Sequence, residues 1–420
     1  MKRLLAFALT LALLLPGCAH VPGSGASLGG DQSSASQSQP EPQPQPEPEP
    51  EPEPVVSRLM VAGDVMSHMP ITNDAYVAET GEYDYSHMFQ FAAQQLEEAD
   101  YAVANLETTL AGGPNYSGYP AFNSPDALAY AAKEAGFDLL STANNHSRDK
   151  GIDGINRTLD VLDEVGLAHV GTYRTQEERD QNHGIHVADV GGISVAFLSY
   201  TYGLNGYQLA SDKMFAVNLF NLDYYTTLAN PNYDLLKADL EAARALDTDL
   251  IAVMIHWGIE YQNAPNSHQT NLAEFLVEQG ADLVLGGHPH VLQPYETISV
   301  TGWDGQEREG FVCYSLGNFI SNQYDPSPAT MTTAILDLEL TKDPATGETA
   351  VTGVGYVPYY MIHRDGAAAG DRRYLLNIHQ AMEEYEAGAS TLVNKSAYGK
   401  LQEALDHCHK ILGAEGDLAA

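Results

Sequence analysis

From Ser57 onward the sequence predicts an α/β fold in which helices pack over sheets, and two observations support this prediction. Short apolar runs of strand length alternate along the chain with amphipathic segments of helical period. The chain is also long enough to bury a sizeable core, because 44% of its 420 residues are apolar.

The expected elements follow one another in a regular order. Apolar runs that end at glycine, asparagine or a charged residue predict strands, and apolar residues repeated at helical spacing predict the helices between them. The segment 203–232 fits neither period and is expected to be an inserted loop region. The expected strands are 58–64, 101–107, 137–145, 192–202, 250–258, 281–288 and 311–319, and the expected helices are 89–99, 154–166, 233–246, 271–281, 375–387 and 397–412.

Residues 1–18 are expected to be a lipoprotein signal peptide. Lys2 and Arg3 precede an apolar run, 4–15, that is too short to remain as a membrane-spanning helix. The run leads into Leu-Leu-Pro-Gly-Cys, which resembles a bacterial lipobox and implies cleavage before Cys18 and lipid attachment to its thiol. We therefore expect anchoring at the outer face of the cell membrane, with an ordinary secretory signal as the alternative.

The remainder divides into three segments. Residues 19–56, rich in proline and glutamate, have almost nothing apolar to bury and are expected to form a disordered linker that acts as a semi-rigid stalk. Residues 57–365 are expected to form the folded domain, and 366–420 a helical C-terminal extension on its outside. The thiols of Cys313 and Cys408 are left, and the sequence does not decide whether they pair.

The charge of the chain limits its partners. Twenty basic against 56 acidic residues give a net charge of −36. Nucleic acid is not expected as a partner, because its binding requires a basic surface. An anionic substrate would need a local positive site, which a metal ion could supply.

Polar side chains gather where the expected strands end. Because strand ends of an α/β fold converge on one crevice, these side chains are expected to lie together. Carboxylate, amide and imidazole groups in one place predict a metal site. Taken singly, each residue could instead be a turn, surface or core residue. The residues concerned are Asp64, Asn105, Glu107, Asn144, Asn145, His146, His256, His288 and His290.

The chain resembles the CapA family, associated with poly-γ-glutamate capsule synthesis, within the calcineurin-like metallophosphoesterase superfamily. The motifs GDVM, NLETTL, ANNHSRDKG, YTYGLNG, IHWGIEYQ, GADLVLGGHPHVLQP and YSLGNFISNQ occur in family order over about residues 59–322. The resemblance implies a layered metallophosphatase-like fold with two central mixed sheets flanked by helices. It also implies one or two divalent metal ions, with Mn, Fe and Zn not distinguished by the sequence.

The resemblance assigns roles to the residues. Asp149 is a candidate to orient His146, which would assist chemistry without binding metal. The family's D-x-H pattern has Met66 in place of the histidine, which leaves open whether one ion or two are bound. His68 could move in to replace it, although a solvent-exposed loop histidine is the expected reading. The implied metal ligands are Asp64, Glu107, Asn145, His256, His288 and His290.

Two functions remain open at this point. One is a metal-dependent hydrolase or transferase that uses metal-activated water on a phosphoester, a γ-glutamyl amide or a cell-wall component. The other is a non-catalytic subunit that assembles or exports poly-γ-glutamate, with a structural or vestigial metal site. The implied partners are poly-γ-glutamate or a cell-wall polymer and membrane synthase subunits. The acidic charge of the chain opposes polyglutamate binding.

Overall fold

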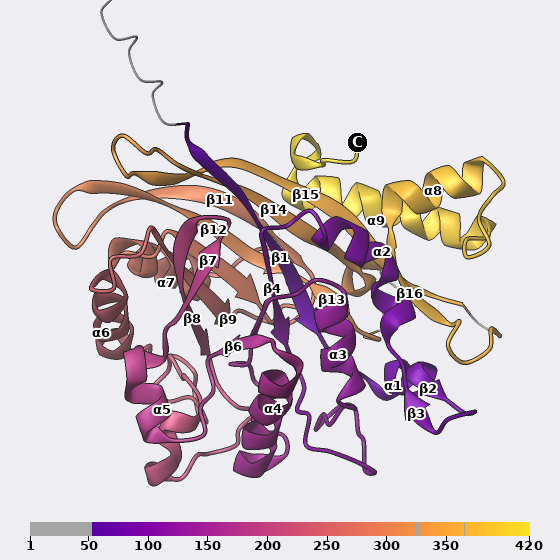
Figure 1. Cartoon of the computed structure of the whole chain (residues 1–420), viewed down its shortest axis with the longest axis horizontal. Coiled ribbons are helices and arrows are strands. Elements are labelled where there is room, and N and C mark those ends of the chain that lie inside the picture. The colour runs from indigo at the N-terminus through magenta and orange to yellow at the C-terminus, as the bar shows by residue number, and fades with distance from the viewer. Residues whose placement is uncertain (1–52, 324–327, 365) are drawn as a thin grey trace, which may run out of the picture. The chain divides into compact units, whose positions relative to one another are not determined.

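Two central sheets organise the chain in the computed structural model, which describes residues 53–323, 328–364 and 366–420 (Figure 1). The first sheet has the strand order β16-β15-β14-β1-β4-β5-β6, and β13 also pairs with β1. Its strands β1, β4, β5 and β6 run parallel, whereas β14, β15 and β16 are antiparallel additions. They span β1 Val55–Val65, β4 Tyr101–Leu106, β5 Leu139–Ser141, β6 Ala168–Val170, β13 Asn318–Ile320, β14 Thr332–Lys342, β15 Thr349–His363 and β16 Arg373–Asn377.

The second sheet has the strand order β11-β12-β10-β9-β8-β7. Strands β8, β9, β10 and β12 run parallel, and antiparallel strands close both edges. The strands are β7 His186–Val190, β8 Ile193–Thr201, β9 Leu250–His256, β10 Leu283–Gly287, β11 Leu292–Thr301 and β12 Glu307–Leu316. A separate two-stranded ribbon consists of β2 Tyr76–Val77 and β3 Glu82–Tyr83.

The two sheets face each other and carry helices on their outer faces. In β1, Leu59 and Val61 pack into the core between the sheets, and Met60 packs against the helices outside. In β9, Ala252 faces the other sheet and Val253 faces outward. This alternation follows from the two-residue period of a strand, and because both faces are buried the strands read as continuous apolar runs.

The helices cover the two outer faces. Helices α2, α3, α8 and α9 contribute to the core outside the first sheet, and α6 and α7 to the core outside the second (Figure 1). None of the helices in the described part of the chain is both long and apolar enough to span a membrane. The helices are α1 Met69–Ala75, α2 Ser86–Leu96, α3 Ala127–Glu134, α4 Gly151–Val165, α5 Gln176–Asp180, α6 Tyr233–Arg244, α7 Ser267–Glu278, α8 Ile378–Glu386 and α9 Lys395–Leu412.

The predicted α/β class, with two central mixed sheets flanked by helices, is confirmed. Two of the predicted boundaries are wrong. Strand β1 begins at Val55, so the last two residues of the expected 19–56 linker are strand that pairs with β14. The expected helical extension 366–420 contains strand β16, because 373–377 completes the edge of the first sheet beside β15.

Other predictions meet the structure only in part. Cys313 and Cys408 are both buried free thiols, so the disulfide left open by the sequence is absent. The signal peptide 1–18, with its lipid site Cys18, and nearly all of the linker lie outside the described residues. Their predictions therefore stay predictions.

A buried carboxylate fastens the C-terminal part of the chain to helix α1. Asp74 accepts hydrogen bonds from the backbone N–H groups of Gly370, Arg372 and Arg373, and its Oδ2 lies 3.3 Å from His87 Nε2. Burial alone would raise the pKa of Asp74, but the hydrogen bonds from His87 and Gly370 lower it below 3.8. Asp74 thus ties the loop before β16 to helix α1.

We expect Asp74→Ala to lower the free energy of unfolding by about 2–4 kcal/mol at pH 7, because it leaves buried N–H groups without an acceptor. Since the folded-state pKa of Asp74 is depressed, its stabilisation is present above pH 3.8 and is lost as the pH falls through the folded value. Urea unfolding at pH 7 and below pH 3.8 checks both points. Glu79→Ala removes an exposed carboxylate nearby and is the control. An equal loss in both variants would contradict this role.

Candidate metal centre

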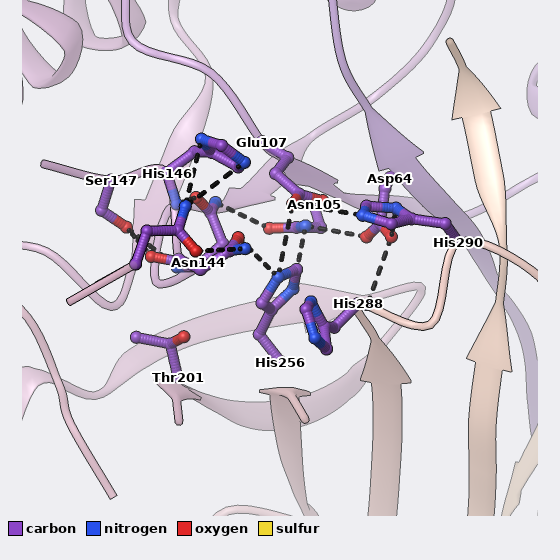
Figure 2. A network of polar contacts seen from close by, with 12 residues as sticks. Asp64, Asn105, Glu107, Asn144, His146, Ser147, Thr201, His256, His288 and His290 are labelled. Carbon is purple, nitrogen blue, oxygen red and sulfur yellow. Dashed lines mark hydrogen bonds and ion pairs between the residues drawn. The ribbon is translucent and has the colours of Figure 1, made fainter. Parts of the chain in front are cut away.

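The ends of the parallel strands bring the predicted site residues together. Asp64 lies at the end of β1, Glu107 directly follows β4, and Asn145 and His146 lie in the loop after β5. From the second sheet, His256 ends β9, and His288 and His290 follow β10. Figure 2 shows the side chains from both sheets pointing toward one another across the gap between the strand ends.

The backbone after β10 is arranged to place two histidines in the centre. His288 and His290 both have positive φ, 96° and 59°. Residues other than glycine rarely adopt this backbone conformation, which costs about 1–3 kcal/mol at each position. Pro289 fixes the backbone between them. A Cβ on Gly287 would lie 2.8 Å from Asp64 Oδ1, so glycine is needed for this close approach. Strained backbone conformations are found most often at functional sites, so their presence at these two histidines supports a functional role for this loop.

The ligand-type atoms form two groups that share Glu107. In the first, Glu107 meets His256 and His288, and in the second it meets Asp64 and His290. In each group the ligand atoms lie within 4.8 Å of one another. The Nε2 atom of His256 is 3.4 Å from Glu107 Oε1 and 3.1 Å from Asn145 Oδ1, which adds Asn145 to the first group. The His290 Nε2 atom is 3.9 Å from Glu107 Oε1.

Asparagine side chains hold these residues in position. Asn105 Nδ2 donates to Asp64 Oδ1 at 2.8 Å, and Asn144 Nδ2 donates in turn to Asn105 Oδ1 at 3.1 Å. His290 Nδ1 lies 3.0 Å from Asn318 Oδ1, an arrangement that leaves Nε2 turned toward Glu107. Outer contacts of this kind fix the tautomer and ring orientation of metal-binding histidines.

The charges in the centre favour a cation. Burial, together with the neighbouring His256 and His290, lowers the pKa of His288 well below 6.5, so its ring is neutral and has a free lone pair. Burial opposes a charge on His290 as well, yet the carboxylates of Glu107 and Asp64 raise its pKa to about 9. The two buried carboxylates therefore hold a proton on a buried ring.

Unpartnered atoms show that the residues fit a metal ion. Both carboxylate oxygens of Glu107 and the Nδ1 atom of His288 are buried without a hydrogen-bond partner among the described residues. Leaving such groups unpaired costs about 1–3 kcal/mol each, and more for a charged group. A divalent cation bound by carboxylate, amide and imidazole would satisfy them, and these donors suit Mn, Fe or Zn.

His146 lies beside these groups and carries its own carboxylate partner. Its Nδ1 atom is 2.7 Å from Asp149 Oδ2, which also accepts the backbone N–H of Phe122 at 2.6 Å. If Nδ1 carries the proton shared with Asp149, Nε2 is available for proton transfer. Figure 2 shows the ring on the Glu107 side of the centre. The hydrogen bond expected between Asp149 and His146 is present, and their catalytic roles stay predictions.

His68 differs from the expectation. It is only 8% exposed, so the interpretation as a solvent-exposed loop histidine is wrong. Its Nδ1 accepts a hydrogen bond from the backbone N–H of Asn322, and its ring packs edge-on against Phe122. Burial and the charges of His290 and His146 lower its pKa to about 4. His68 lies outside the two ligand groups, and Met66 is buried.

Sequence reasoning missed several residues that surround the centre. Asn205 receives a hydrogen bond from Asn145 and lies 3.5 Å from the His146 ring, and Asn318 contacts His290. Both lie in quoted motifs, YTYGLNG and YSLGNF, which were the available signal. Glu260 forms a third possible ligand group with His288 and His290.

Comparisons with known proteins agree on one family. A family model described as bacterial capsule synthesis protein PGA_cap matches residues 58–323. The capsule biosynthesis protein CapA of Bacillus anthracis is 30% identical over 246 residues, 57% of this chain and 55% of the relative. The PGA biosynthesis protein CapA of Bacillus subtilis (strain 168) is 28% identical over 239 residues, 56% of this chain and 57% of the relative. The chain thus spans little more than half the length of these curated relatives.

Solved structures that align with the chain include the calcineurin-like phosphoesterase YfkN from Bacillus subtilis. It aligns with a TM-score of 0.41 at 13% identity and covers 84% of this chain and 98% of its own. A phosphatase from Mycoplasma pneumoniae aligns with a TM-score of 0.38 at 13% identity, covering 72% of this chain and 93% of its own.

We expect Glu107→Gln to abolish metal binding in both groups, because each contains Glu107. Metal in hundredfold excess over its dissociation constant should stabilise the wild type by about 2.7 kcal/mol and leave the variant unchanged. Metal content by plasma mass spectrometry and thermal unfolding with and without chelator check this. Glu134→Gln, an exposed carboxylate outside the centre, is the control. Full metal content in Glu107→Gln would contradict the assignment.

Proposed function

The chain belongs to the PGA_cap family of bacterial capsule synthesis proteins, and on this premise we propose that it takes part in making or remodelling a cell-envelope polymer. We propose further that it does so as a metal-dependent hydrolase or transferase. One observation carries the proposal: two groups of buried ligand atoms share Glu107, whose carboxylate oxygens have no other partner among the described residues. Two adjacent ions suit displacement at a phosphoester or a related carbonyl group.

The chain's own residues supply positioning and proton transfer. When bound, divalent ions would provide Lewis acidity for attack by water and for the charge that develops on the reacting group. Asp64, Glu107, Asn145, His256, His288 and His290 would hold those ions. Asp149 orients His146 through Nδ1. With both ring nitrogens protonated, His146 would donate its Nε2 proton to the leaving oxygen or nitrogen and become neutral, with the Nδ1 proton still held by Asp149. Asn205 Nδ2 lies 3.5 Å from both nitrogens of the ring.

A second function, a non-catalytic assembly or export subunit of a polyglutamate synthesis complex, is favoured by one observation. Met66 is buried where the D-x-H pattern has a histidine, so the Asp64 group lacks one ligand. In this proposal the metal would be structural or vestigial, and membrane synthase subunits would be the partners. Binding of metal without hydrolysis of any phosphoester or γ-glutamyl amide would support this function over the first.

We propose the outer face of the cell membrane as the location. The support is the sequence alone: the apolar run 4–15, the lipobox-like Leu-Leu-Pro-Gly-Cys and the proline- and glutamate-rich segment that follows. A lipid on Cys18 would tether the domain through that segment. A soluble or membrane-bound envelope polymer would then be within its reach.

We expect His146→Asn to lower kcat for a phosphodiester with an alkoxide leaving group by about 10²–10⁴-fold in the Mn²⁺-loaded protein, because this poor leaving oxygen needs a proton donor. Its metal content should not change, since His146 is absent from both ligand groups. Steady-state kinetics and metal analysis on the same sample check this. His186→Asn, a histidine on β7 away from the centre, is the control. An unaltered kcat would remove His146 from the mechanism.

We expect Cys18→Ser to move the protein from the detergent phase to the aqueous phase in Triton X-114 partitioning of expressing cells. Each acyl CH₂ buried in a membrane contributes about 0.8 kcal/mol, and the variant has no thiol to carry the chains. Incorporation of labelled palmitate into the wild type but not the variant is the second measurement. Detergent partitioning of Cys18→Ser equal to that of the wild type would refute the anchor.

A further inference from the structure

A pocket of about 490 Å³ opens directly beside the metal centre. It is lined by His288 of the centre and by Tyr202, and these two rings lie 4.6 Å apart. Tyr202 also stacks on His256, with an interplanar angle of 7°. A substrate whose reacting group lies at the metal ligands therefore has this pocket next to it. Its volume is in the range of small-molecule sites.

The wall of the pocket is largely apolar and preformed. Leu228 and Phe220 come from the inserted segment, and Trp257 and Ile259 follow β9. The loop that carries Leu228 is fixed by Asp223, which accepts the backbone N–H groups of Ala229 and Asn230 at 2.9 and 3.0 Å. The pocket thus presents apolar surface from a loop that is braced by its own hydrogen bonds.

Several polar side chains in the pocket are already engaged by the protein. Gln269 donates to Gln293 at 2.8 Å and accepts the backbone N–H of Asn266. Asn266 accepts the backbone N–H of His268, and Asn221 donates to the backbone of Tyr202. These groups cap and brace the surrounding loops. Few of them are left to recognise a polar ligand.

The charge of the pocket disfavours an anion. The described residues that line it include no lysine or arginine, and its one carboxylate, Glu260, lies at the side of His288. A carboxylate of the substrate placed here would meet Glu260 and the acidic charge of the whole chain, −36. Unpaired charge in such a site is costly.

We propose that this pocket selects substrates in which the group beside the reacting phosphoryl or acyl centre is uncharged and largely apolar, such as an aromatic or aliphatic ring. The inference rests on the proposed function, because it assumes that the reacting group of the substrate lies at the metal ligands. It specifies the substrate class of that function, and it disfavours a chain of free carboxylates next to the reacting centre. Leu228 and Ile259 are the specificity-determining residues.

Binding of phosphonates to the Mn²⁺-loaded full chain tests the proposal by calorimetry, without requiring turnover. We expect phenylphosphonate to bind at least about tenfold more tightly than methylphosphonate or 3-phosphonopropanoate, because only its ring fills the pocket. Leu228→Lys, and independently Ile259→Lys, should reduce this preference to near unity. Leu246→Lys is the matched control, since Leu246 is 39% exposed against 40% for Leu228 and lies outside the pocket.

Equal affinity for the three phosphonates, a preference for the carboxylate compound, or no binding of phenylphosphonate would overturn the inference. So would a preference that survives both lysine variants. Failure of the proposed function looks different: phenylphosphonate would bind with the expected preference while no phosphoester or amide is hydrolysed. If the protein hydrolyses a substrate but shows no preference for the ring, the proposed hydrolase function stands and the inference about the pocket is wrong.

Discussion

A buried carboxylate without a hydrogen-bond donor must be balanced by positive charge, and Glu107 imposes this requirement on the whole centre. Its carboxylate lies where strand ends of the two sheets meet, and its Oε1 atom is 3.4 Å from His256 Nε2 and 3.9 Å from His290 Nε2. In the protein alone, burial opposes a charge on His290, yet the carboxylates of Glu107 and Asp64 raise its pKa to about 9. A divalent ion would supply the charge more fully and would engage the unpartnered Nδ1 of His288 at the same time.

The geometry of the two sheets brings ligand side chains to the Glu107 carboxylate. Parallel strands from both sheets end at one edge, so that side chains distant in sequence converge there. The close approach at Gly287 and the strained backbone of His288 and His290 are local costs of that convergence. They are tolerated because the cores of both sheets hold the strand ends rigidly.

The sequence predicted which polar side chains lie together at the strand ends better than it predicted the strands and loops that surround them. Continuous apolar runs ending in Asp64, His256 or His288 marked both the buried strands and the polar side chains that follow them. Strand β15 escaped prediction because Gly353 and Pro358 interrupt its pattern, and only pairing with β14 on one side and β16 on the other makes it a strand. The pocket wall of segment 203–232 depends on contacts between side chains and backbone within the loop, such as those of Asp223 with Ala229 and Asn230, which follow no helix or strand period. The burial of His68 depends on Asn322 and Phe122, which are distant from it in sequence.

The antiparallel strands beyond the matched region bear on how this protein can be divided. The family match ends at residue 323, whereas β14 begins at Thr332 and pairs with β1 from Val55 to Val61, directly upstream of Asp64. A recombinant fragment trimmed to the match would contain the predicted metal-binding residues but would leave one side of β1 as an open edge, prone to self-association. The stretch shared with the relatives contains the predicted metal ligands, whereas the sheet that carries Asp64 is completed by strands that lie beyond that stretch.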